Sequence, residues 1–139
     1  MILRKLTSMD LDFLLEVRND DTTRVNLEND SVFTLDECVK WFFTKNPLWY
    51  IIEVDGVSVG YIRTNDSEVG IDIHPNYRRK GYAREAYKLY LEVKNYASLW
   101  VFVDNFAKNL YTELGFVENG NSKIIRDREY IQMIYENRN

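Results

Sequence analysis

The sequence is poor in residues that build covalent frameworks or membrane segments. It contains one cysteine, two prolines and six glycines in 139 residues. Cys38 alone excludes an intrachain disulfide, and a reducing compartment, the cytoplasm, is the expected location. No apolar run approaches the roughly 20 residues of a membrane span, and the first residues lack the apolar region of a signal peptide. We therefore expect no membrane partner.

Positive charge is also scarce relative to negative charge. Eighteen Lys and Arg residues stand against 22 Asp and Glu residues, a formal net charge of -4. This balance argues against a general nucleic-acid binder, which usually has a net basic surface, and suits a cationic substrate such as an amine. The length fits one domain over residues 1–139 with a single real core, and no repeat or linker divides it.

Periodicity and capping signals predict mixed secondary structure. Ser8 is a candidate N-cap, Thr34 and Glu37 form a capping-box pattern, and Asp55-Gly56 suits a two-residue hairpin turn. Asp104 can cap a late helix, which Gly115 would end. The predicted strands are 2–6, 49–54, 57–64, 68–73, 99–103, 123–126 and 130–135, and the predicted helices are 10–19, one from 35, 81–96 and 105–114.

A basic loop between a strand and a helix is the most informative segment. It runs Arg78-Arg79-Lys80-Gly81-Tyr82-Ala83 and reads R-x-x-G-x-A. The first turn of a helix has unpaired N–H groups and partial positive charge, and both favour a phosphate group. Gly81 has no Cβ to keep the backbone away from a bound anion. The loop therefore predicts a polyphosphate site.

This loop and a later block together resemble the GCN5-related N-acetyltransferase (GNAT) superfamily. The block 107–116 matches the family pattern A-x-x-L-Y-x-x-x-G-F, and Arg78, Gly81 and Ala83 fill the family's acyl-CoA loop. The resemblance implies an α/β (α+β) fold: a mostly antiparallel sheet of about seven strands with a splayed parallel central pair, flanked by about four helices. It implies an N-acetyltransferase that uses acetyl-CoA and no metal. Short matches near the N-terminus resemble the branch with ribosomal-protein N-terminal acetyltransferases.

The resemblance also implies roles for individual residues. Tyr111 would place its hydroxyl near the thioester sulfur and protonate the departing thiolate. A backbone N–H near Asp72 or Ile73 would stabilise the oxyanion, and Ile71 and Ile73 would contact the pantetheine arm through their backbone. The expected phosphate ligands are the N–H groups of Arg79, Lys80, Gly81, Tyr82 and Ala83 and the side chains of Arg78, Arg79, Lys80 and Arg84.

Two further positions concern the nucleotide and the helix that carries Tyr111. Lys108 is a candidate for the nucleotide end. Many relatives have an asparagine where this sequence has Asp104, which has no amide group to donate, and Asn105 would supply the contact after a one-residue slip.

The proton acceptor and several alternatives stay open. Glu68 and Asp72 share one face of a strand, and either would accept the amine's proton directly or through water. His74 has a suitable ordinary pKa, but a structural role is favoured. The acceptor is a small-molecule or peptide amine, and the chain is a monomer or a homodimer. The rival readings are a CoA-binding sensor or scaffold without turnover, and an interaction protein with an anionic partner.

Overall fold

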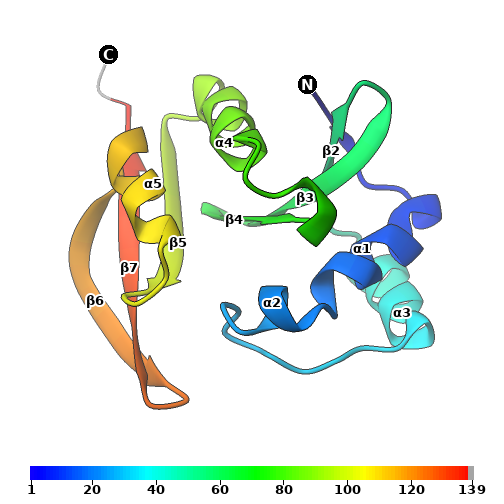
Figure 1. Ribbon diagram of the computed structural model, residues 1–139, viewed down its shortest axis with the longest axis horizontal. Helices are drawn as coiled ribbons and strands as arrows, with labels where there is room; N and C mark the ends of the chain where they lie inside the picture. Colours follow the sequence, from blue (N-terminus) through cyan, green and yellow to red (C-terminus); the bar gives the residue numbers. More distant parts are fainter. Residues whose placement is uncertain (138–139) are drawn as a thin grey trace.

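The computed structural model describes residues 1–137, which form one twisted sheet with helices around it (Figure 1). The strands are β1 (Ile2–Lys5), β2 (Tyr50–Val54), β3 (Val57–Asn65), β4 (Glu68–Ile73), β5 (Tyr96–Phe102), β6 (Val117–Ile125) and β7 (Arg128–Glu136). The α-helices are α1 (Leu11–Arg18), α2 (Asp21–Arg24), α3 (Leu35–Lys45), α4 (Tyr82–Glu92) and α5 (Ala107–Leu114), and the 3-10 turns are η1 (Ser8–Asp10) and η2 (Pro75–Tyr77).

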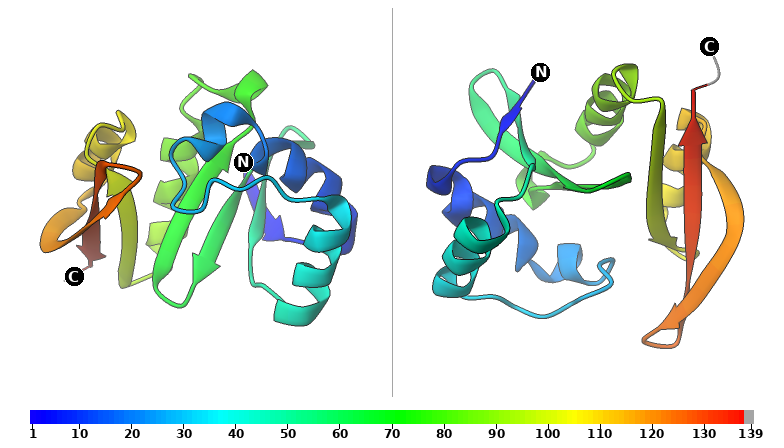
Figure 2. Two further views of the ribbon diagram at one scale, coloured as in Figure 1. Left: turned by 90° about the horizontal axis from the view of Figure 1, so that it is seen from below. Right: turned by 180° about the vertical axis from the view of Figure 1, so that it is seen from behind.

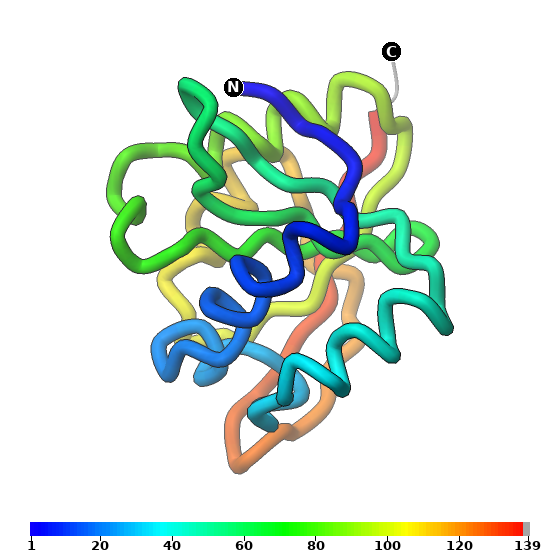
Figure 3. The backbone as a smooth tube through the Cα atoms, turned by 90° about the vertical axis from the view of Figure 1, so that its right-hand side faces the viewer, coloured from blue at the N-terminus to red at the C-terminus, as the bar shows by residue number. Residues whose placement is uncertain are grey.

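The seven strands lie in the order β1-β2-β3-β4-β5-β7-β6. All neighbours are antiparallel except β4 and β5, which are parallel. Seen from behind, β4 and β5 diverge after they meet, so that the sheet has two wings (Figure 2). The predicted fold class, with its splayed parallel pair, is confirmed. The first strand and the end of β7 lie toward the same side of the molecule (Figure 3).

Side chains along β2 and β3 point alternately to the two faces of the sheet. A hydrophobic core therefore forms on each face of the N-terminal wing, which consists of β1 to β4. Ile51 and Tyr61 pack with α1 and α3, whereas Ile52 and Ile62 pack with α4. All four side chains are fully buried. This period of two is what a sheet covered on both faces requires. The wing therefore has a rigid floor under the face that carries α1 and α2.

Several predicted elements are confirmed at their capping residues. The Thr34 hydroxyl accepts from the Glu37 N–H at 3.1 Å, and the Glu37 carboxylate accepts from the Thr34 N–H at 3.0 Å, which closes the capping box. Asp55 and Gly56 have φ of 51° and 79°, as a hairpin turn of this kind needs. Gly115 ends α5 with φ 104°.

Other predicted boundaries are wrong. Helix α4 ends at Glu92 rather than near Tyr96, because Val93 is 79% exposed and Tyr96 already pairs with β7. Thr7, not Ser8, precedes the first turn, and its N–H donates to Asp10 at 2.8 Å. The short helix α2 is a fifth α-helix. None of the helices between residues 1 and 137 is long and apolar enough to cross a bilayer.

Two C-terminal predictions are also corrected. Asp104 does not cap α5, because its carboxylate accepts from Arg128 at 2.7 Å. The sixth strand begins at Val117, well before the predicted start at Lys123, with a register shift between Glu118 and Ser122. The polar run that contains Gly120 conceals this part of the strand from periodicity.

Candidate active site

The edge of β4 is open where β5 leaves it. The two strands pair only at Glu68 and Ser98. The His74 N–H donates to Val59 on β3 at 2.8 Å. Because backbone groups alternate along a strand, the N–H groups of Ile71 and Ile73 face the other way, toward the gap. The Asp72 N–H faces β3, so the structure corrects the expectation of a backbone contact from Asp72.

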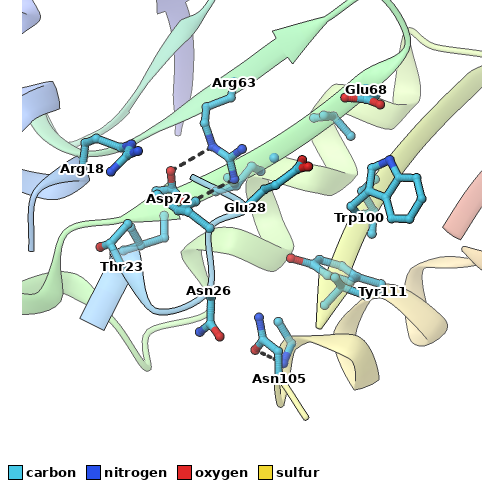
Figure 4. Close-up of a pocket in the computed structure, with 18 of the residues that line it drawn as sticks. Arg18, Thr23, Asn26, Glu28, Arg63, Glu68, Asp72, Trp100, Asn105 and Tyr111 are labelled. Carbon is cyan, nitrogen blue, oxygen red and sulfur yellow. Dashed lines mark hydrogen bonds and ion pairs between the residues drawn. The ribbon is translucent and has the colours of Figure 1, made fainter. Parts of the chain in front are cut away.

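A cleft of about 590 Å³ occupies the space between the wings. Its walls come from α2 and the loop after it, from β3 to β5, from α5 and from β7. Figure 4 shows its side chains, with Tyr111 and Asn105 on one side and the acidic and basic groups of β3 and β4 on the other. The predicted site residues in its lining are Glu68, Ile71, Asp72, Ile73, Arg78, Asn105 and Tyr111.

An ion pair between Arg63 and Asp72 lies across the floor of the cleft. Arg63 Nε donates to Asp72 Oδ2 at 2.9 Å, and the Asp72 side chain is only 9% exposed. The guanidinium rests on Gly70, where a Cβ would lie 2.3 Å from Arg63 Nη2. A larger residue at this position would therefore displace the guanidinium from its present place. Both carboxylate oxygens of Asp72 accept from Arg63, while the Glu68 side chain has neither a hydrogen bond nor an ion pair within residues 1–137.

Tyr111 lies in the cleft on α5 and packs edge-on against Tyr87, with ring centroids 5.5 Å apart. Burial raises the pKa of the Tyr111 hydroxyl, and the nearby Tyr87 hydroxyl and the positive charge of Arg63 oppose this increase. The Tyr111 hydroxyl is therefore protonated at neutral pH. It can donate a hydrogen bond into the cleft.

The loop before α4 and the first turn of this helix contain backbone N–H groups that make no backbone hydrogen bond within residues 1–137. Arg79 and Gly81 both have positive φ, 63° and 79°, and Gly81 is the N-cap of α4. The Glu85 N–H is the first to reach a helical acceptor, the Gly81 carbonyl, at 3.1 Å. The preceding N–H groups, including those of Tyr82 and Ala83, make no backbone bond within the described chain. Alternating φ at a helix start forms an anion-binding concavity.

The predicted cationic ligands divide into three groups. Arg79 and Lys80 are exposed and have no ion pair within residues 1–137. Arg78 turns away from the helix start, because it donates to the Ile73 carbonyl at 3.0 Å and to Thr23 Oγ1 at 2.8 Å. The other two pair with neighbouring carboxylates: Arg84 with Glu113, and Lys108 with Glu118 at 3.5 Å.

The structure places Asn105 in the lining of the cleft and His74 outside it. Asn105 Oδ1 accepts from the Ala107 N–H at 2.9 Å, which supports the start of α5, and the residue lines the cleft. His74 is buried outside the cleft lining, where Nδ1 accepts from Asn76 and Nε2 lies 3.0 Å from Glu16 Oε1. This environment agrees with the structural role that the sequence favours for His74.

Comparisons with known proteins agree with this geometry. The sequence model of the acetyltransferase (GNAT) family matches residues 11–116, about three quarters of the chain. The chain belongs to the GNAT family. The expected family and class of enzyme are confirmed, and a search among curated proteins gives no match.

Solved structures resemble this GNAT chain over nearly its whole length. The spermidine N-acetyltransferase from Vibrio cholerae, in complex with CoA and spermine, has a TM-score of 0.85 at 23% identity, covering 97% of this chain and 94% of that one. A ribosomal-protein-alanine N-acetyltransferase from Brucella melitensis has a TM-score of 0.77 at 20% identity, with coverages of 99% and 100%. The yncA structure from Salmonella typhimurium, with its cofactor acetyl-CoA, has a TM-score of 0.75 at 20% identity, with coverages of 98% and 93%. At these identities the likeness establishes the fold.

Sequence reasoning missed much of the acceptor side of this GNAT cleft. Arg18, Arg63, Glu28 and Tyr87 all line it, yet only Arg18 belongs to a short N-terminal match, Arg18-Asn19-Asp20, and none was predicted as a site residue. For Arg63 a signal existed: it follows the hairpin turn on a strand that pairs with β4, opposite Gly70. The others come from helices and loops far from β4 in the sequence.

The loop after α2 is tied to the opposite wing by three cations, an arrangement that we call the cross-cleft clasp. Lys123 Nζ lies 2.8 Å from Glu28 Oε1, and Arg126 donates to the Leu27 carbonyl at 2.6 Å. Arg128 donates to Asn26 Oδ1 at 3.2 Å. The clasp joins the N-terminal wing to the β6–β7 hairpin along one rim of the cleft.

Proposed function

We propose that this acetyltransferase moves an acetyl group from acetyl-CoA to a primary amine by direct attack within a ternary complex. The observation that carries the proposal is the combination of an open β4 edge, a half-buried tyrosine that lines the same cleft and a helix start with unused N–H donors. These three features supply what acyl transfer from a thioester needs: an oxyanion donor, a thiolate acid and a phosphate cradle.

The residues present fit acetyl-CoA. The N–H groups at the start of α4 would hold its phosphates, with Arg79 and Lys80 adding positive charge. When bound, acetyl-CoA supplies the thioester carbonyl that the amine attacks. The backbone N–H of Ile73 would donate to that carbonyl oxygen, and a preorganised donor of this kind stabilises the developing charge, while the N–H of Ile71 would contact the pantetheine arm. Asn105 would add an amide group, consistent with a one-residue slip from Asp104.

Tyr111 and Glu68 would handle the two protons. Because burial raises the pKa of the Tyr111 hydroxyl, the group keeps its proton until a thiolate forms beside it. Glu68 is the better candidate for accepting the amine's proton, because Asp72 is already bonded to Arg63. An alkyl ammonium has a pKa of about 10.4, so proton removal is required at neutral pH.

Thermal unfolding with acetyl-CoA, desulfo-CoA and ATP in parallel tests the proposal. A ligand at about 100 times its Kd adds about 2.7 kcal/mol, which raises the Tm by roughly 5–10 °C in a domain of this size. We expect the rise with both CoA compounds and little with ATP, followed by release of CoA thiol when primary amines are added. A rise in Tm without turnover of any amine would instead indicate a CoA-binding module. No rise would refute the cofactor site.

Substitution of Glu68 tests the proton acceptor. Glu68→Gln is expected to lower kcat/KM at pH 7 by about 10²-fold, with the loss shrinking at higher pH as more amine is neutral. Asp66→Asn, in the turn just before β4, is the control and should leave the pH profile unchanged. A Glu68→Gln profile that matches the wild type would mean that the amine binds in its neutral form.

A further inference from the structure

Arg18 is a cleft cation without a carboxylate partner. It is half-buried at the end of α1 and lines the cleft together with Arg63 and Asp72. Its Nη1 and Nη2 atoms donate to the carbonyl oxygens of Ser31 and Asn29, at 3.1 and 2.6 Å. A guanidinium has five N–H donors, so three remain beyond these two bonds.

The surrounding charges leave Arg18 uncompensated. Asp72 is bonded to Arg63, and Glu28 pairs with Lys123 in the clasp. Burial lowers the pKa of Arg18, and the opposing effect of Asp72 is smaller. Arg18 is half-buried, and its Cζ lies over the Phe33 ring, 5.0 Å from the ring centroid, but no carboxylate balances its charge. A partly buried charge of this kind is stabilised when a ligand supplies the counter-charge. This end of the cleft therefore carries the positive charge of Arg18 with no carboxylate partner among residues 1–137.

The other end of the cleft carries the opposite charge. In Figure 4, Arg18 and Glu68 lie on opposite sides of the Arg63–Asp72 pair. Glu68 is a carboxylate without an ion pair in the described chain. A cation at one end and a carboxylate at the other match a molecule that has an amine and an anionic group. A polycation would face Arg18 with a like charge, which is unfavourable.

We propose that Arg18 binds a carboxylate carried by the acceptor, so that the acceptor is an amino acid or a peptide amine with a nearby carboxylate. The inference rests on the proposed function for the identity of the amine as acceptor. It distinguishes this chain from the structural neighbour whose complex contains spermine, a polycation. Arg18 would act as a specificity residue that fixes one end of the acceptor while the amine reaches the β4 edge.

Matched ligand pairs test the proposal by binding, independently of turnover. Calorimetry on the CoA-saturated protein would compare L-leucine with L-leucinamide, and the amidated peptide Ala-Asp-Ala with Ala-Asn-Ala. We expect the acid member of one pair to bind about 10- to 100-fold more tightly than its amide, as for a charge-assisted hydrogen bond. The pair that shows the preference identifies free amino acids or peptides as the class. Spermidine should bind no more tightly than the amides.

Two kinds of variant separate ligand binding from loop support. Arg18→Gln should bring the acid-to-amide ratio close to one, and Arg18→Lys should keep part of it. Arg24→Gln is the matched control, because Arg24 also holds this loop, with donations to the Asn19 and Asp30 carbonyls, but does not line the cleft. Its ratio should equal that of the wild type, with Tm values recorded for every variant.

Three outcomes would overturn the proposal: no preference in either pair, no binding by either pair, or an equal loss of preference in Arg24→Gln. Preference for the acid without acetylation of any ligand would support the carboxylate site and refute the transfer reaction. The two proposals thus fail separately.

Discussion

The two sides of the cleft are built in different ways. On the side of α4, the expected ligands are backbone N–H groups that the chain leaves open at residues 79–83. On the side of α1 and α2, the polar side chains are already bonded, as in the Arg63–Asp72 pair and the clasp. A phosphate site made of backbone N–H groups depends on the local φ angles, and it tolerates changes in the neighbouring side chains. A side-chain network depends on every member, because removing one leaves its partner buried and unpaired.

The sharpest test of this comparison lies between the two sides, at Tyr111. Tyr111→Phe is expected to lower kcat by about 10²- to 10⁴-fold, because a proton donor for the thiolate is lost. The Kd for acetyl-CoA should change little, because the α4 backbone is intact. Stopped-flow rates and calorimetry would measure the two quantities. Tyr130→Phe is the control in the same cleft, and a similar rate loss in both variants would refute a specific role for Tyr111.

The side-chain network is expected to fail on a single substitution. Asp72→Asn should lower the free energy of unfolding by about 2 kcal/mol, because Arg63 loses its counter-charge while it remains two-thirds buried. This value is below the 3–5 kcal/mol of fully buried pairs, because solvent screens the exposed part of Arg63. Urea unfolding would measure it. Glu113→Gln, at the exposed pair with Arg84, should change stability by less than about 0.5 kcal/mol.

Lowering the pH should weaken the hydrogen bonds of Asp10 at the start of α1 before it affects the backbone N–H groups at the start of α4. Hydrogen bonds from Arg4, and secondarily from Thr7, lower the pKa of the Asp10 carboxyl in the folded protein. A lowered folded pKa means that this stability is present above the unfolded value, about 3.9, and is lost as the pH falls through the folded value. Asp10→Asn should therefore lower stability at pH 7 by about 1–2 kcal/mol.

The same variant should also lose less stability than the wild type between pH 4 and pH 2. Urea midpoints across this range would measure the difference. Asp21→Asn is the control, because Asp21 is almost fully exposed beside Arg24. Parallel curves for Asp10→Asn and the wild type would contradict the assignment.

The backbone side should show the smallest but most selective effect. Gly81→Ala is expected to cost about 1 kcal/mol of stability, because alanine is strained at φ 79°, and to weaken acetyl-CoA binding up to tenfold. Gly56→Ala is a matched control with the same φ of 79° and open space around it. It should lose similar stability and keep full affinity. Equal affinity loss in both would mean that Gly81 has no special place in the cradle.

The difference between the sides also explains which features the sequence could predict. The α4 loop and Tyr111 belong to short continuous motifs, so local patterns located them. Helix α4 was predicted too long because Val93 continues the apolar spacing, yet the strand that begins at Tyr96 prevails through pairing with β7. Asp104 looked like a cap, but a tertiary partner, Arg128, competes for it. Arg18 lies in a short N-terminal match, Arg18-Asn19-Asp20, but its place in the cleft follows only from the fold.

The cross-cleft clasp has a consequence for the order of folding events. It joins residues about 100 positions apart, and Arg126 and Leu27 are separated by 99. Such contacts form only after both wings exist, because a long loop must close before any contact compensates for its entropy. The clasp is thus expected to assemble last. Since the final contacts made are also the first released in native fluctuations, amides of residues 25–27 should exchange hydrogen faster than those of β5 and β7.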